Sequence, residues 1–167
     1  MKTFRMIGMA LFAVLMCVNF ASCSSSDDEP ETDDMDFTGY TSTNLKINGL
    51  TFWYSTEYSG VNFYEYNNSF GFVFQDGKLS NGAYAGISLE ELPQSTINSN
   101  KNIATDIRFQ ACPNPDGGLV SDYKYTSGRI SVREENGIFK INFNNAVFQN
   151  YEINDKQTLN GDISFRL

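Results

Sequence analysis

Two segments of this chain alternate large apolar residues with smaller or polar ones, and this period of two restricts its fold more than any other feature. The alternating residues are Phe70, Phe72 and Phe74 in one segment, and Phe139, Ile141 and Phe143 in the other. Successive side chains of a β-strand point to opposite faces, so the pattern predicts strands with one buried face. We find no stretch of the domain with the length and period of an amphipathic helix.

Turn sequences separate the apolar stretches. Asn48-Gly49 and Asn136-Gly137 predict hairpin turns, because both positions of a tight hairpin turn need positive φ. Asp76-Gly77 and Asn81-Gly82 predict two further turns. Residues 103–109 and 120–126 again have strand character, whereas residues 90–102 are polar, contain a proline and predict a loop with at most one helical turn.

Residues 1–22 predict a lipoprotein signal peptide. Lys2 and Arg5 precede an apolar run over residues 6–18, which is the pattern of a secretory leader. The run is shorter than the roughly 20 residues that span a bilayer. Ala21-Ser22-Cys23 resembles the lipobox of bacterial lipoproteins, although Phe20 stands where that family usually has an aliphatic residue. The resemblance implies that Cys23 carries lipid chains, and two or three such chains hold a protein at a membrane.

Residues 23–40 predict a lipidated, disordered and acidic tether. Seven acidic residues lie between positions 27 and 36, and so polar a segment cannot bury enough surface to offset the entropy of ordering. The run Ser24-Ser25-Ser26-Asp27-Asp28-Glu29 resembles the export signal of surface lipoproteins in Bacteroidota-type bacteria. It implies an anchor in the outer membrane with the protein on the cell surface; the alternative is the periplasmic face.

Residues 41–167 predict one antiparallel β domain. Short strands at a spacing of about 8–12 residues are typical of a sandwich or barrel, and we expect an all-β, antiparallel β-sandwich of about 8–10 strands. Ile47-Asn48-Gly49 near the start and Leu159-Asn160-Gly161 near the end resemble small uncharacterised lipoproteins of the same bacterial group. That resemblance implies a sandwich or, as the alternative, a lipocalin-like or calycin-like barrel.

Composition excludes several kinds of chemistry. The chain has no histidine, so Ser-His-Asp and Cys-His catalysis and histidine-bound zinc are excluded. From residue 37 onward 13 acidic residues face 10 basic ones, a net charge of −3 that does not favour a nucleic-acid partner. Cys112 is the one cysteine of the domain, and its neighbours predict burial rather than reactivity.

Acidic residues give no sign of a catalytic or metal site. Glu90-Glu91 and Glu134-Glu135 are adjacent pairs, and neighbours in a strand point to opposite faces, so neither pair predicts two carboxyls flanking a bond. Asn114 and Asp116 could offer oxygen ligands to calcium, but no full ligand pattern is present, and a turn that uses these residues for backbone reasons is the favoured interpretation. We expect no enzymatic activity, no metal and no cofactor.

Aromatic residues give the strongest candidate site. Many of them crowd residues 52–66, where neighbours must face opposite sides of a strand. One side is core, and the other can present Trp53, Tyr58 or Tyr64 to a ligand, since exposed aromatic rings suit binding surfaces. The alternative is that these residues belong to a two-layer core or that a neighbouring loop covers them. We therefore expect a binding module for a glycan, a peptide or a small apolar ligand, or for an envelope partner. A structural, adhesin-type or accessory subunit without a small ligand is the alternative.

Overall fold

The computed structural model describes residues 36–112 and 118–166. The compact unit begins at Phe37, slightly before the expected boundary at residue 41. The predicted leader, Cys23, most of the tether, and the calcium candidates Asn114 and Asp116 lie outside the described residues. Nowhere in the described part of the chain is there a helix whose length and apolar character would let it cross a membrane.

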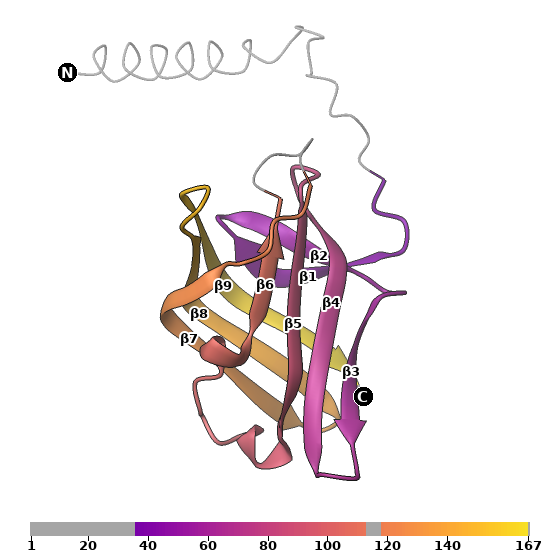
Figure 1. The fold of residues 1–167 in the computed structure, drawn as a ribbon. Coiled ribbons are helices and arrows are strands. Elements are labelled where there is room, and N and C mark those ends of the chain that lie inside the picture. Colours follow the sequence, from indigo (N-terminus) through magenta and orange to yellow (C-terminus); the bar gives the residue numbers. More distant parts are fainter. Residues whose placement is uncertain (1–35, 113–117, 167) are drawn as a thin grey trace, which may run out of the picture. The chain divides into compact units, whose positions relative to one another are not determined.

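Nine strands form a single antiparallel sheet in the described residues (Figure 1). They are β1 Tyr40–Ile47, β2 Leu50–Ser55, β3 Ser59–Tyr64, β4 Ser69–Leu79, β5 Tyr84–Pro93, β6 Arg108–Ala111, β7 Lys124–Glu135, β8 Ile138–Asn150 and β9 Asp155–Arg166. Two short 3₁₀ turns, η1 Gln94–Thr96 and η2 Ala104–Asp106, follow β5. The strand order is β6-β5-β4-β2-β1-β9-β8-β7, with β3 beside β4. The all-β antiparallel prediction is confirmed, and the sheet curls until it nearly closes into a barrel.

The Asn-Gly turns form where the sequence predicts them. Asn48 and Gly49 have φ values of 49° and 84°, and they connect β1 to β2 with Ile47 opposite Leu50. Asn136 and Gly137 have φ values of 54° and 74° and connect β7 to β8. Positive φ at both central residues matches the twist of the strands that such a turn joins.

Aromatic rings fill the interior of the curled sheet. The largest buried side chains come from three different strands and are at most 2 % exposed: Phe52, Phe70, Phe72, Phe74, Phe139 and Phe148. Phe70, Phe72 and Phe74 share the inner face of β4, as the alternation predicts. Cys112 is buried as well, which confirms the expectation drawn from its neighbours. These rings belong to one continuous hydrophobic core.

Several local predictions are wrong, among them the start of the loop predicted over residues 90–102, since β5 continues to Pro93. Asp76-Gly77 does not end a strand, because β4 continues to Leu79 and accommodates the pair in a register shift against β5. Asp76 still has a positive φ of 51°, so the local conformation is turn-like while the ladder continues. Gly77 allows the close approach of Phe52, whose ring carbon Cε2 would lie 2.2 Å from a Cβ at this position.

The strands predicted over residues 103–109 and 120–126 begin later than expected, because residues 103–107 and 120–123 do not belong to β6 or β7. The chain there forms η2, and a single bridge joins Val120 to Ala111 before β7 begins at Lys124. Ile103 donates its N–H to the carbonyl of Ile130 at 2.9 Å, so this segment satisfies the outer edge of β7 instead of forming a ladder of its own. Tertiary contacts thus determine the conformation of this segment, although its alternation alone favours a strand.

Candidate functional site

The sheet divides at β4, and this division creates an apolar groove. One end of β4 pairs with β2, at Phe52↔Leu79 and Trp53↔Lys78, and the other end pairs with β3, from Ser59↔Phe74 to Tyr64↔Ser69. β2 and β3 therefore run in the same direction along β4, interrupted by residues 56–58. Next to β2 lies β1, whereas no further described strand pairs with β3.

The last part of β9 forms the opposite side of this groove. β1 pairs with β9 only at Lys46↔Asn160 and Ile47↔Leu159, so beyond Asn160 the ladder of β9 continues only with β8. The resulting hollow has a volume of about 600 Å³. We call it the β3 groove, and it is lined by Tyr54, Thr56, Ser59, Gly60, Val61, Phe63, Phe74, Phe165 and Arg166.

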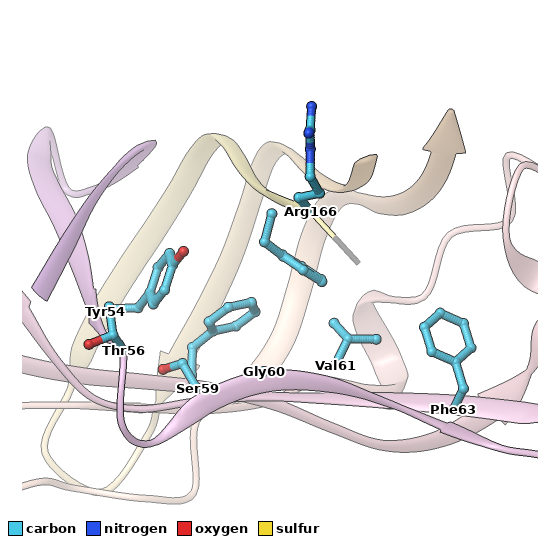
Figure 2. Close-up of a pocket in the computed structure, with 9 residues that line it drawn as sticks. Tyr54, Thr56, Ser59, Gly60, Val61, Phe63 and Arg166 are labelled. Atoms are coloured by element: carbon cyan, nitrogen blue, oxygen red, sulfur yellow. The ribbon is translucent and has the colours of Figure 1, made fainter. Parts of the chain in front are cut away.

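The inner face of β3 supplies one wall of the β3 groove. Val61 is opposite Phe72 and Phe63 is opposite Phe70, so both point to the side on which β4 carries its buried phenylalanines. Figure 2 shows Tyr54, Val61 and Phe63 rising on the same side of the β3 backbone. Phe63 is 39 % exposed although it faces inward, because no described strand pairs with the other edge of β3.

Aromatic rings pack continuously along the wall behind the opening. The ring centroids of Tyr54 and Phe74 are 5.3 Å apart, and those of Phe74 and Phe165 are 6.0 Å apart. Phe165 lies 5.1 Å from Phe139, which in turn lies 6.1 Å from Phe63. Rings at such separations support one another, so the wall is a fixed apolar surface rather than a set of independent side chains.

Polar groups in the lining are few. The Oγ atom of Ser59 is buried and makes no hydrogen bond with the described residues. An unsatisfied buried hydroxyl costs about 1–3 kcal/mol, and a ligand in the groove could satisfy it. Arg166 follows Phe165 on β9, and its guanidinium is directed away from β3 (Figure 2), so its positive charge lies at the rim. The described lining residues include no carboxylate, thiol or lysine.

Trp53, the first of the predicted site residues, lies on the outer face of β2. Its neighbour Phe52 is fully buried, so the adjacency rule places Trp53 correctly on the other side. Residues just before β1 cover it: the ring of Phe37 lies 4.7 Å from the Trp53 ring. Lys78 places its Nζ 5.8 Å from the Phe37 ring centroid and 4.6 Å from that of Tyr40. Trp53 is thus part of an outer-face cluster and does not line the β3 groove.

Tyr58 and Tyr64 also lie outside the β3 groove lining. Tyr58 is 52 % exposed in the connection between β2 and β3, where the Glu57 carboxylate raises the pKa of its phenol. Tyr64 points away from Phe63, and its ring lies 6.0 Å from that of Tyr66. Among the described residues no ring contact joins the three predicted residues to one another, so the structure does not gather them into one site.

The acidic pairs have structural partners. Glu90 forms an exposed ion pair of 2.6 Å with Arg108. On the other face of β5, Glu91 accepts hydrogen bonds from Ser69, Asn67 and Tyr66. The Ser69 and Asn67 bonds lower the pKa of Glu91, because they favour its charged form. In the second pair, Glu134 accepts the backbone N–H of Gly137 in the β7–β8 turn.

Tyr123 and Asp155 form a further pair of hydrogen-bonded titratable groups. Tyr123 donates to Asp155, and burial together with this carboxylate raises the pKa of its phenol. No three acidic, cysteine or histidine side chains gather in the described residues in a way that could hold a metal ion.

Sequence reasoning missed the groove-lining residues. The only sequence signal for Tyr54, Val61 and Phe63 is the alternation of side chains along a strand. It places each of them on the same face as a buried residue of its own strand or of the paired strand. No sequence pattern marks Phe165 and Arg166 as groove-lining residues, because they line the groove only when the fold places β9 beside β3. The chain matches no protein-family model, and no similar curated protein or solved structure was found. Fold and site together define the class: an all-β, barrel-like domain with an apolar groove in its wall.

Proposed function

We propose that this chain is a lipid-anchored lipoprotein of the cell envelope whose β domain is a binding module. The leader and Cys23 support the anchor, and the acidic serine-rich segment supports outward placement on the outer membrane. The β3 groove supports binding: a partly exposed phenylalanine on an inward face, backed by packed rings, is a fixed apolar surface that a ligand can cover.

The composition of the lining favours binding over catalysis. The described lining offers the hydroxyls of Thr56 and Ser59 but no carboxylate or lysine that could activate them as a base, and the chain has no histidine. The expected ligand is apolar or aromatic in the part that enters, and an acidic group is favoured near Arg166 at the rim. A structural or accessory role is the second candidate function, because, over the described residues, the interior of the domain is filled with side chains rather than with space for a ligand.

The anchor is tested on the full chain expressed in a bacterial host that processes lipoproteins. Mass spectrometry of the mature N-terminus should find residue 23 first and carrying acyl chains, with the protein in the membrane fraction. The Cys23→Ser variant should lose the acyl mass and leave the membrane fraction. An unmodified thiol at position 23, or a wild-type chain released into the medium, would contradict the anchor.

The groove is tested by photolabelling the full chain in lipid nanodiscs with a diazirine-bearing benzoate, which combines a ring with a carboxylate. Labels should map to residues 54–63 and 165–166. Val61→Glu should reduce labelling about fivefold or more. The new carboxylate lies in the apolar lining, where it is unfavourable and repels the carboxylate of the probe.

Asn62→Glu is the matched control, since it adds the same charge one position along β3 on the exposed outer side. Labelling of this variant should stay near the wild-type level, and circular dichroism should show both variants folded. If labels gather instead on Trp53 and Tyr64, or if the two variants behave alike, the β3 groove is not the binding site.

A further inference from the structure

In the described residues, other parts of the chain cover the unpaired backbone edges of the outermost strands β6 and β7, but not the unpaired edge of β3. Along the outer edge of β7, the backbone groups of even-numbered residues form hydrogen bonds with the loop after β5. Asn98 donates its own N–H to Val132, and its side-chain amide both donates to and accepts from the backbone of Glu134, each at 3.0 Å. Asn102 accepts the Ile130 N–H at 2.9 Å. This edge is therefore covered at Ile130, Val132 and Glu134 by the loop after β5.

β6, at the other end of the sheet, is protected by length and by a bridge. It has four residues, and Ala111 exchanges two backbone hydrogen bonds with Val120, at 2.8 and 3.2 Å. Short edge strands and covered edges are the usual means by which folded proteins prevent pairing with another chain.

In the described part of the chain, β3 has none of these protections. Its sequence over Ser59–Tyr64 contains no charge and no proline. Its backbone hydrogen bonds within the described residues go only to β4. Every second residue of a strand directs its N–H and C=O away from the paired neighbour, so β3 presents a row of unused donors and acceptors to the β3 groove. Across the groove, by contrast, the end of β9 carries the charge of Arg166.

We propose that the β3 groove takes an extended polypeptide strand of a partner protein, which pairs with the open edge of β3. This inference rests on the proposed binding function and names its ligand class. The backbone of the added strand pairs with β3, and its inward side chains, one in two, cover Val61 and Phe63. Such a strand satisfies the open edge, which a compact apolar molecule cannot do. An acidic residue of the partner near the rim complements Arg166.

The strand pairing is tested with the full chain in lipid nanodiscs. Random displayed peptides of about eight residues are selected on the wild type and counter-selected on Val61→Glu. We expect enriched sequences that alternate apolar with polar residues. An enriched peptide should also slow amide hydrogen exchange over residues 59–64, because strand addition protects the edge.

Backbone methylation then separates strand pairing from side-chain binding. Two versions of the enriched peptide carry N-methyl groups on alternate residues, one version on the even set and the other on the odd set. An added strand has one edge on β3 and one in solvent, so one version should bind at least tenfold more weakly and the other nearly unchanged.

Three results overturn the inference. These are no enrichment over the counter-selected variant, equal weakening by both methylated sets, and unchanged exchange over residues 59–64. If the diazirine benzoate still labels the β3 groove in those cases, the binding function stands and its ligand is not a strand. If the benzoate also fails, the proposed function fails with the inference.

Discussion

Replacing Gly161 with alanine should lower the free energy of unfolding by about 4 kcal/mol, from strained backbone and overpacking together. Gly161 has a φ of 117°, and a Cβ there would lie 2.1 Å from the carbonyl oxygen of Asn44 and 3.1 Å from the Cα of Leu45. Both obstacles are backbone atoms, which cannot rotate away. The glycine lies where β1 separates from β9, so the substitution should also loosen the end of β9 that carries Phe165.

Gly49→Ala is the matched control for this prediction. Gly49 also has a positive φ, 84°, but a Cβ there would meet nothing within 4 Å. Only the backbone preference is lost, which costs about 1–2 kcal/mol. Urea denaturation of both variants measures the difference. Equal losses would show that conformation alone, and not the close approach of β1, makes Gly161 necessary.

Features set by neighbours in sequence are the ones that could be predicted. The Asn48-Gly49 hairpin forms because its turn chemistry is complete within two residues. The alternation of Phe70, Phe72 and Phe74 gives the buried face of β4, because side-chain direction has a period of two in any strand. Both arguments hold whatever lies further along the chain.

Features set by distant parts of the chain could not be predicted. Asp76-Gly77 has the local conformation of a turn, yet β5 pairs on both sides of it and turns it into an irregularity within β4. Trp53 faces outward as parity requires, but Phe37 covers it, which strand periodicity does not reveal. The β3 groove depends on β9 ending beside β3, a juxtaposition that no local pattern of either strand specifies.

The second large effect should come from Phe139, the ring behind the β3 groove. Phe139 is fully buried, and its ring centroid lies 5.6 Å from that of Phe70 and 5.1 Å from that of Phe165. Phe139→Ala should lower the free energy of unfolding by about 3–5 kcal/mol, because it removes a core ring and leaves a cavity that the packed neighbours cannot close. Phe63 and Phe165 would lose their common support, so photolabelling of the β3 groove should fall as well.

Two further variants make this prediction specific to the buried ring. Phe139→Leu keeps much of the volume and should cost about 1.5 kcal/mol or slightly more. Phe63→Ala removes a ring that is already 39 % exposed, so it should cost less than Phe139→Ala while reducing labelling directly. Urea denaturation gives the order of stabilities, and photolabelling gives the order of binding. If Phe63→Ala proved the more destabilising of the two alanine variants, Phe63 would be a core residue and the groove beside β3 would be closed in solution.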